Sequence, residues 1–345
     1  MSLQSEIQEQ PVVLQALLEN QMGTVENIAR AIRSADPRYV FLAARGTSDN
    51  AGRYANYLWG AMNQLPIALA TPSLFTYYQQ PPRFNGALVV GISQSGKSPD
   101  IVSVLEEGRR QGCPTLAVTN EPDSPLANAA DFIIPIQAGE EKAVAATKTY
   151  TAELMALAML SAALRQDDEM KAVLKQVPGW LNETLQREEQ IARSAERYRY
   201  MGHCVVIGRG YNYATAFEWA LKIKELTYVV AEPYSNADFQ HGPVAMVERG
   251  FPVMVIAPSG KVHENLVSFL RPLRDVHHAE LMIISDRAEA LSLAQTGISI
   301  PSGIPEWISP LVCVIPGQLF AANLARVKGW DTENPRTIQK VTETH

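Results

Sequence analysis

The amino-acid sequence predicts an α/β protein made of two tandem units, each a doubly wound parallel sheet covered by helices. Short apolar runs alternate with amphipathic segments of helix length, which is the pattern of successive βα units. One offset of 164 residues carries Arg45-Gly46 onto Arg209-Gly210, and each of these dipeptides ends an apolar run. The same offset aligns two further pairs of apolar runs, which indicates an internal duplication. The length of 345 residues also favours about two domains.

The first unit follows a helical segment over residues 8–35, in which a break is expected near Gly23, with Thr24 capping the second part. Each expected strand is a short apolar run, and each expected helix places its apolar residues on one face. The strands are expected at 39–44, 67–70, 87–92, 114–119 and 132–136, and the helices at 49–63 and 99–111.

Residues 149–194 are expected to be helical and to link the two units, with breaks near Asp167-Asp168 and Pro178-Gly179. The second unit repeats the order of the first. Its strands are expected at 203–208, 252–257, 280–285 and 297–300, and its helices at 213–228, 264–275 and 309–327. The predicted boundaries are 1–36 for the N-terminal helical segment, 37–165 for the first unit, 166–196 for the linker, 197–330 for the second unit and 331–345 for a C-terminal tail.

Composition excludes several classes of function. The net charge of −6, without a basic run, argues against nucleic acid as a ligand. No apolar run reaches about 18 residues and the polar N-terminus lacks a signal-peptide pattern, so we expect a cytoplasmic protein that does not bind membranes. Cys113, Cys204 and Cys313 lie far apart in or beside apolar segments, which favours reduced core residues. We expect no metal and no cofactor.

A Ser/Gly-rich loop follows the apolar run at residues 87–90 and precedes a helix that begins at Pro99. The N–H groups of such a loop and of the helix N-terminus converge on one point, where they bind phosphate. The hydroxyls of Ser93, Ser95 and Ser98 add donors without charge. An ordinary turn rich in small residues is the alternative interpretation. The loops at 45–50 and 93–98 both leave carboxyl ends of strands and are expected to share one pocket.

The second unit repeats this strand and loop at residues 253–261. Two of the hydroxyls are replaced there, because Ala257 corresponds to Ser93 and Val262 corresponds to Ser98. We therefore expect the first unit to keep the phosphate site and the second unit to have lost it.

Charged side chains that could carry chemistry lie in the second unit and the tail. Glu218, Lys222 and Glu225 fall on one face of the helix at 213–228, which is apolar enough to be buried, and buried charges need partners or a function. A solvated row of ion pairs is the alternative. His241 precedes Gly-Pro in a predicted turn, and Lys340 stands in the polar tail. Either residue, taken alone, is commonly an ordinary surface side chain.

Together these segments resemble the sugar isomerase (SIS) family, in particular the isomerase region of the glucosamine-6-phosphate synthases (glutamine–fructose-6-phosphate aminotransferases). The resemblance covers essentially the whole chain and implies two tandem SIS units of the flavodoxin-like, three-layer α/β/α type. The segments that carry it are Glu6-Ile7-Gln8-Glu9-Gln10-Pro11, Arg45-Gly46-Thr47-Ser48, Ser93-Gln94-Ser95-Gly96, Val144-Ala145-Ala146-Thr147-Lys148, Ala220-Leu221-Lys222-Ile223-Lys224-Glu225, Gln240-His241-Gly242-Pro243 and Pro335-Arg336-Thr337-Ile338-Gln339-Lys340.

The resemblance implies a role for each matching residue. Glu225 is expected to move a proton between C1 and C2 of the sugar, with Lys222 beside it. His241 is expected to help open the sugar ring from the partner subunit of a homodimer, and Lys340 to form a Schiff base with the open-chain ketose. The phosphate is expected to bind Ser93, Gln94, Ser95 and Ser98, and the sugar site is expected to include Thr47, Ser48 and Val144.

Two departures from the family pattern bear on substrate choice. The glutaminase domain of the synthases has no counterpart in this sequence. Ala146 replaces a serine in the sugar-facing run, and Gln339 and Val341 replace small residues on either side of Lys340.

The favoured hypothesis is an isomerase and deaminase that converts an amino-sugar phosphate, such as glucosamine 6-phosphate, into fructose 6-phosphate and ammonia. The alternatives are the synthase direction with external ammonia, a deglycase of amine-linked sugar phosphates, and a non-catalytic phosphosugar sensor.

Overall fold

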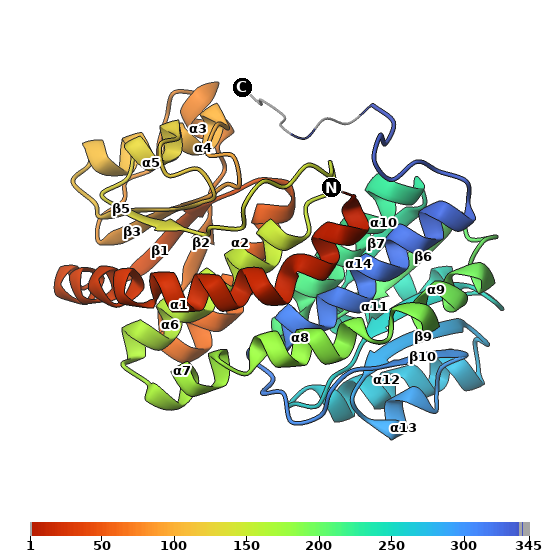
Figure 1. Cartoon of the computed structure of the whole chain (residues 1–345). Helices are drawn as coiled ribbons and strands as arrows, with labels where there is room; N and C mark the ends of the chain where they lie inside the picture. The colour runs from red at the N-terminus through yellow and green to blue at the C-terminus, as the bar shows by residue number, and fades with distance from the viewer. Residues whose placement is uncertain (1, 338–339, 341–345) are drawn as a thin grey trace. The chain divides into compact units, whose positions relative to one another are not determined.

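The computed structural model describes residues 2–337 and residue 340, and its chain divides into two compact units. The first unit comprises residues 9–141 and 146–178 together with Lys340. The second unit comprises residues 2–8, 142–145 and 179–337. Each unit contains one five-stranded sheet, shown in Figure 1, in which every pair of neighbouring strands is parallel.

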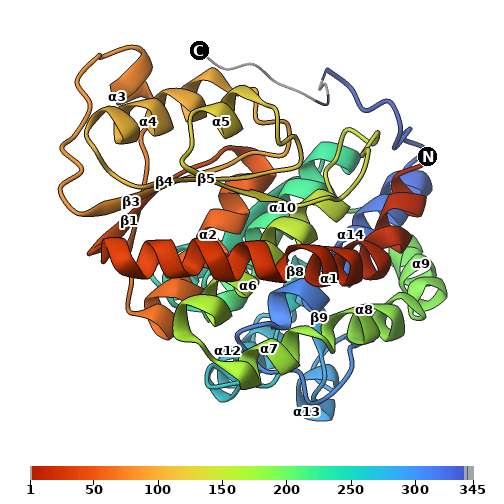
Figure 2. The ribbon, with the colours of Figure 1, turned by 60° about the vertical axis from the view of Figure 1, so that its left-hand side comes forward.

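The sheet of the first unit has the strand order β2-β1-β3-β4-β5. Helices α3, α4 and α5 cover one face of it, and α2 and α6 cover the other (Figure 2). The elements are β1 (Tyr39–Ala43), α2 (Gly46–Asn63), β2 (Ile67–Leu69), α3 (Ser73–Thr76), β3 (Ala87–Ile92), α4 (Pro99–Arg110), β4 (Thr115–Thr119), α5 (Pro125–Asn128), β5 (Phe132–Pro135), α6 (Lys148–Arg165) and α7 (Asp168–Leu174).

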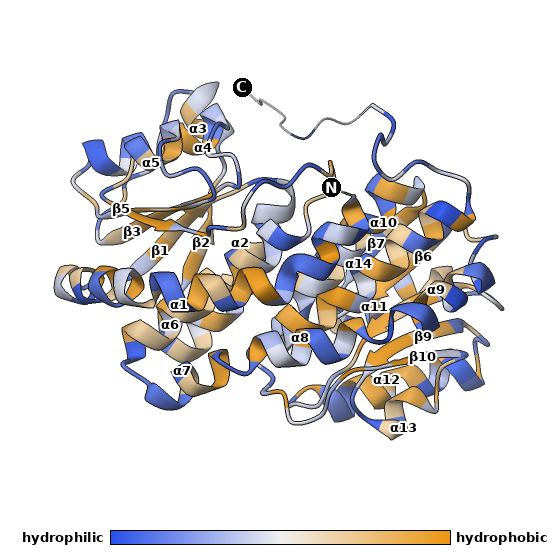
Figure 3. Ribbon diagram, in the orientation of Figure 1, coloured by the Kyte–Doolittle hydropathy of each residue, from blue (hydrophilic) through white to orange (hydrophobic). Residues whose placement is uncertain are grey.

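The central strand β3 is buried at every position because helices cover both faces of the sheet. Alternate residues of the strand point to opposite faces. Ala87 and Val89 join the core cluster beneath α4, which also includes Ile101 and Leu105. The apolar runs in the sequence are therefore buried strands, and Figure 3 shows β3 in apolar colours.

The sheet of the second unit has the order β10-β9-β8-β6-β7, which repeats the topology of the first. Its elements are α8 (Val177–Leu185), which begins at the end of the first unit, α9 (Glu188–Arg197), β6 (His203–Ile207), η1 (Gly210–Asn212), α10 (Tyr213–Thr227), β7 (Val230–Tyr234), α11 (Asn236–Gln240), η2 (Pro243–Met246), β8 (Pro252–Ile256), α12 (His263–Asp275), β9 (Glu280–Ser285), α13 (Ala288–Leu291), β10 (Thr296–Ser299) and α14 (Ser309–Val327).

The duplication extends from end to end of the two sheets. The offset of 164 residues places β1 (Tyr39–Ala43) on β6 (His203–Ile207) and β5 (Phe132–Pro135) on β10 (Thr296–Ser299) without a shift. In both copies the direction in which successive strands are added to the sheet reverses. The resulting switch point lies between β1 and β3 in the first unit and between β6 and β8 in the second. Ligands of such sheets bind beyond the carboxyl ends of the strands at that point.

Two expectations about elements were wrong. The N-terminal segment is one continuous helix, α1 (Leu3–Ala35), which contains Gly23 and also Pro11. A single interior glycine costs only about 1 kcal/mol, which the buried face of this helix offsets. The break expected near Pro178-Gly179 is confirmed, because α7 ends at Leu174 and α8 begins at Val177. Pro178 then lies in the first turn of α8, where proline is tolerated.

The second wrong expectation concerns the strands of the second unit, because the sequence analysis did not include one after α10. β7 (Val230–Tyr234) pairs with β6 as the edge strand of the second sheet. The sequence concealed it because it contains Glu232 and Pro233 and is only partly buried. An edge strand tolerates proline and charge because one side of its backbone needs no partner strand.

Among the described residues, one helix is long and apolar enough to cross a membrane. This helix is α14, and 89% of its apolar window is buried within the structure. It packs against α9 and α10 as a core helix of the second unit.

Candidate functional site

The serine-rich loop at residues 93–98 joins β3 to α4 in the first unit, at the switch point of the sheet. The neighbouring strand holds it, because the Gln94 carbonyl accepts bonds from the Asn120 N–H at 3.1 Å and the Thr119 hydroxyl at 3.3 Å. Gly96 has a φ of +61°, and a Cβ at this position would lie 2.1 Å from Ser124 Oγ. Only glycine fits this turn without strain.

Residues 91–98 also have the Gly-x-x-x-x-Gly-Lys-Ser spacing of nucleotide-binding loops. The structure gives the first glycine another role. Gly91 lies inside β3, where Leu105 and Leu126 fill the space that a Cβ would need, and Lys97 is exposed. The glycine at 91 therefore serves packing between the sheet and its helices.

Two backbone N–H groups of the loop donate long hydrogen bonds to serine hydroxyls of the same loop. Ser93 Oγ accepts from the Gly96 N–H at 3.2 Å, and Ser95 Oγ accepts from the Lys97 N–H at 3.3 Å. Ser98 precedes the first turn of α4 but its hydroxyl does not cap the helix. An anion at this position can accept from these N–H groups and from the serine hydroxyls.

The loop after β1 contacts the first turn of α4, which directly follows the anion loop. Arg45 Nε donates to Asp100 Oδ2 at 2.6 Å, and Asp100, in the first turn of α4, is buried. At the start of α2, Ser48 Oγ donates to the buried carboxylate of Glu153 at 2.8 Å. Thr47 is half-buried beside it. The residues after β1 and β3 are thus joined within one unit.

In the second unit, carboxylates of the protein itself occupy the corresponding loop, which follows β8. The N–H and hydroxyl of Ser259 both donate to the carboxylate of Asp286, at 2.6 Å and 2.5 Å. The Lys261 N–H donates to Glu306 at 2.9 Å, and the Glu306 side chain occupies the space beside Gly260. These donors have internal carboxylate partners, whereas the corresponding donors of the first unit face only weak acceptors.

The tail lysine pairs with a buried carboxylate. Lys340 Nζ donates to Glu141 Oε2 at 2.6 Å, and the Glu141 side chain is fully buried while the Lys340 side chain is 23% exposed. Burial raises the pKa of Glu141, but the charge of Lys340 and hydrogen bonds from Lys340, Thr147 and Thr149 outweigh it, so the pKa lies below its usual value. Glu141 is therefore an ionised carboxylate at neutral pH.

The segment that follows Glu141 contains two of the expected sugar-facing residues, Val144 and Ala146, and both are half-buried. A second buried carboxylate fixes its backbone, since Glu6 accepts from the Lys142 N–H at 2.6 Å and from the Ala143 N–H. Glu6 is the first residue of the N-terminal motif seen in the sequence. The structure therefore explains this motif as a support for the segment.

In the second unit, α10 presents a cluster of three charges. Lys222 Nζ lies 2.6 Å from Glu225 Oε2 and 3.4 Å from Glu218 Oε1. Glu218 and Lys222 are buried, whereas 25% of the Glu225 side chain is exposed. The cluster is not a solvated row of ion pairs, so that alternative is wrong. Glu225 is the member that a ligand can reach.

His241 ends α11 in a turn, as its Gly-Pro context predicts. It is exposed, and the following Gly242 has a φ of +141°. The tail motif also has an anchor in this unit. The Arg336 guanidinium stacks on the rings of Tyr228 and Trp330, at 4.6 Å and 4.0 Å from their centroids.

The expected site residues are divided between the units. The first unit contains the anion loop, Thr47, Ser48, Ala146 and Lys340, and the second contains Val144, Lys222, Glu225 and His241. Gln339 lies outside the described residues. The sequence analysis assigned no role to Glu141, Glu153 or Glu6. Glu153 had a signal, because it stands in the apolar helix α6 much as Glu218 stands in α10. Glu141 and Glu6 contact residues distant along the chain, which a single sequence does not show.

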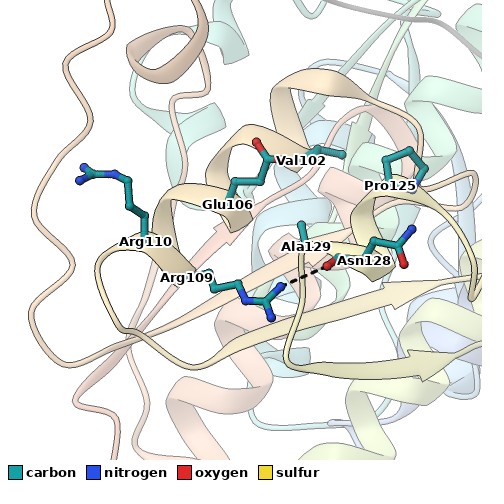
Figure 4. A pocket seen from close by; sticks show the side chains of 7 residues that line it. All are labelled: Val102, Glu106, Arg109, Arg110, Pro125, Asn128 and Ala129. Atoms are coloured by element: carbon teal, nitrogen blue, oxygen red, sulfur yellow. Dashed lines mark hydrogen bonds between the residues drawn. The ribbon is translucent and has the colours of Figure 1, made fainter.

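A surface pocket in the first unit is separate from these groups. It lies between α4 and α5 and is lined by residues of those helices and their ends, including Arg109, Arg110 and Asn128 (Figure 4). Arg109 donates to the Asn128 carbonyl at 3.3 Å. None of the anion-loop residues lines this pocket.

Comparisons with known proteins agree with the geometry. The SIS domain profile matches residues 34–163 and 199–327. A glutamine–fructose-6-phosphate aminotransferase from Brucella abortus is 31% identical over 98% of this chain, but the chain spans only 58% of that relative. The C-terminal domain of a glucosamine-fructose-6-phosphate aminotransferase from Francisella tularensis superposes with a TM-score of 0.88, at 26% identity, over 96% of this chain and 97% of that one.

A second solved structure is similar over its whole length. It is described as a putative phosphosugar isomerase from Silicibacter pomeroyi DSS-3, and it is 31% identical with a TM-score of 0.85. The match covers 96% of this chain and 100% of that one.

Proposed function

Because the chain belongs to the SIS domain family, we propose that it is a phosphosugar isomerase and deaminase, which converts an amino-sugar phosphate such as glucosamine 6-phosphate into fructose 6-phosphate and ammonia. The observation that carries the proposal is the pairing of Lys340 with Glu141 in the unit that holds the anion loop. A sensor needs the loop but has no use for a reactive amine held by a buried carboxylate.

The anion loop supports a phosphorylated substrate. Its donors are backbone N–H groups and uncharged hydroxyls of Ser93, Ser95 and Ser98, so the bound phosphate forms no ion pair with them and can leave after turnover. Hydrogen bonds from Asn120 and Thr119 to the Gln94 carbonyl hold the loop before the ligand arrives, which lowers the entropic cost of binding.

Isomerisation needs a base that moves a proton between C1 and C2 of the open-chain sugar. Glu225 suits this role because its carboxylate is partly exposed and Lys222 holds one of its oxygens at 2.6 Å. Lys222 is itself held by the buried Glu218. The pair thus presents a positioned carboxylate beside a fixed positive charge, which stabilises a developing enediolate.

Ring opening and imine formation complete the reaction. We assign ring opening to His241, reaching in from the partner subunit of a homodimer, and its exposure agrees with that role. We assign the imine to Lys340, since an imine at C2 makes the neighbouring C–H more acidic.

The three cysteines are not part of the proposed reaction. Cys204 and Cys313 are buried and Cys113 is half-buried. Burial raises the pKa of all three thiols, that of Cys204 to about 12. Thiols of this kind remain protonated at neutral pH, so we assign none of them a nucleophilic role.

The test is ammonia release from glucosamine 6-phosphate, with galactosamine 6-phosphate measured in parallel. We expect release from one of them, and we expect Glu225→Gln to lower kcat by about 10²–10⁴-fold while phosphosugar binding is retained. Glu248→Gln, which alters an exposed carboxylate of the same unit, is the control.

Three other results would replace the proposal. Formation of glucosamine 6-phosphate from fructose 6-phosphate and ammonium alone would identify the synthase direction. Turnover of an amine-linked sugar phosphate alone would identify a deglycase. Thermal stabilisation by phosphosugars without any turnover would identify a sensor.

A further inference from the structure

Glu141 has an unusually complete set of hydrogen-bond donors. Its Oε1 accepts from the backbone N–H groups of Thr147 at 2.9 Å and Thr149 at 3.1 Å. Its Oε2 accepts from the Thr149 hydroxyl at 2.7 Å and from Lys340 Nζ at 2.6 Å. Three of the four donors belong to the turn that begins α6, so the carboxylate is fixed by its own neighbourhood.

The fourth donor comes from 199 residues away along the chain. A buried carboxylate that is already bonded to three local donors does not need a lysine to satisfy its hydrogen bonds. It does retain a full negative charge without a solvent shell, and that charge attracts a cation. The geometry therefore supplies a fixed negative point at which the tail amine is held.

We propose that Glu141 positions the amine of Lys340 and acts as the counter-ion of the cationic imine that forms there. This inference rests on the proposed function, because it assumes that Lys340 reacts with a ketose phosphate. Glu141 touches the reacting nitrogen through its hydrogen bond and does not itself bond to the sugar.

The charge balance of the step explains why a carboxylate suits this position. The Lys340 nitrogen forms a bond to C2 of the ketose, and the carbonyl oxygen leaves as water with two protons that the ammonium group carried at the start. The nitrogen keeps one proton and the positive charge. The cation is present before and after the step, so the ion pair with Glu141 persists while the sugar is attached.

The fixed carboxylate also sets the position of the nitrogen. Reactions between held groups are fast because orientation is established before the chemical step. Replacing the carboxylate by a neutral amide keeps the shape but removes the charge, so we expect imine formation to fall while phosphate recognition by the loop persists.

The main experiment traps the imine with borohydride in the presence of fructose 6-phosphate and measures the mass of the intact protein. We expect trapping in the wild type and a loss of at least about tenfold in Glu141→Gln, with a parallel fall in kcat and a KM within about twofold. Glu140→Gln removes the adjacent exposed carboxylate and is the matched control, which we expect to trap as the wild type does.

A second measurement does not depend on any sugar. Trypsin cleaves after lysine, and the ion pair holds Lys340, so we expect cleavage after Lys340 to be several-fold faster in Glu141→Gln than in the wild type or Glu140→Gln. Phosphate binding and the thermal unfolding midpoint establish that the variant is folded. If Glu141→Gln does not fold, Thr149→Val removes one donor from Oε2, and its trapping is expected to fall.

The outcomes separate the two proposals. Trapping in Glu141→Gln equal to or greater than in the wild type overturns the inference about Glu141. A wild type that traps no sugar overturns the proposed function, and the trypsin comparison then decides the positioning: faster cleavage in Glu141→Gln supports it, and equal cleavage overturns it.

Discussion

At the scale of single residues, the structure reveals buried carboxylates to which the sequence analysis assigned no role. Glu225, His241 and Lys340 can be identified because they stand in recognisable motifs. Glu6 stands in such a motif too, but its role in holding a backbone segment is visible only in the structure. Glu141 has no sequence signal, since its partner Lys340 is distant along the chain, whereas Glu153 could have been found because it stands in the apolar helix α6.

The ionised state of Glu141 makes a pH-dependent contribution to stability. Its folded-state pKa is lowered by Lys340 and by hydrogen bonds despite burial, relative to an unfolded value of about 4.3. The stabilisation is therefore complete above about pH 4.3 and is lost as the pH falls through the folded-state pKa. We expect the difference in unfolding free energy between the wild type and Glu141→Gln to shrink on acidification in urea titrations, and a constant difference would contradict this.

Gly96 offers a second test at the residue scale. Its φ of +61° and the proximity of Ser124 mean that alanine must both strain the backbone and displace its neighbour. We expect Gly96→Ala to destabilise the fold by about 1–3 kcal/mol and to abolish measurable phosphosugar binding by calorimetry.

The matched control is Gly112→Ala. Gly112 has a similar φ of +74° but open space around the position of the new Cβ. Gly112→Ala should lower the free energy of unfolding by only about 1 kcal/mol and should bind phosphosugar as the wild type does. Equal binding losses in both variants would show that strain alone, without the clash, explains the effect.

At the scale of elements, the sequence predicts those with strong periodicity and misses those stabilised by their position. The central strands and long helices were predicted to within one or two residues, except α1, α2 and the helices after α6. The edge strand β7 was missed, because its stability comes from pairing with β6 rather than from an apolar run. The break expected at Gly23 was wrong because propensity is a weaker determinant than the packing of a long helix.

The two loops at the switch points predict how many phosphosugar molecules each chain binds. The donors of Ser259 and Lys261 are bonded to Asp286 and Glu306, whereas the anion loop at 93–98 has no internal carboxylate at these donors among the described residues. We expect isothermal titration with a non-reactive sugar-alcohol phosphate to give one site per chain. Two equivalent sites per chain would contradict the assignment of the second loop as filled.

At the scale of the whole molecule, the duplication was predictable from sequence because strands, loops and helices recur at one offset. Each of the five strands of one unit has a counterpart in the other unit, although only some of these pairs are similar in sequence. Whether each copy keeps an open anion-binding loop was only partly predictable. The loss of Ser93 and Ser98 counterparts indicated that the second loop had changed, but the carboxylates that fill it come from residues with no sequence relation to the loop.

The filled loop has a consequence for competition with solutes. A carboxylate attached to the same chain has an effective concentration set by its tether, commonly in the millimolar range or above, and it does not diffuse away. Inorganic phosphate in a cell must displace Asp286 and Glu306 together to occupy that loop. We therefore expect the second copy, in which Gly260 has a φ of +157° where Gly96 has +61°, to be insensitive to the surrounding phosphate pool.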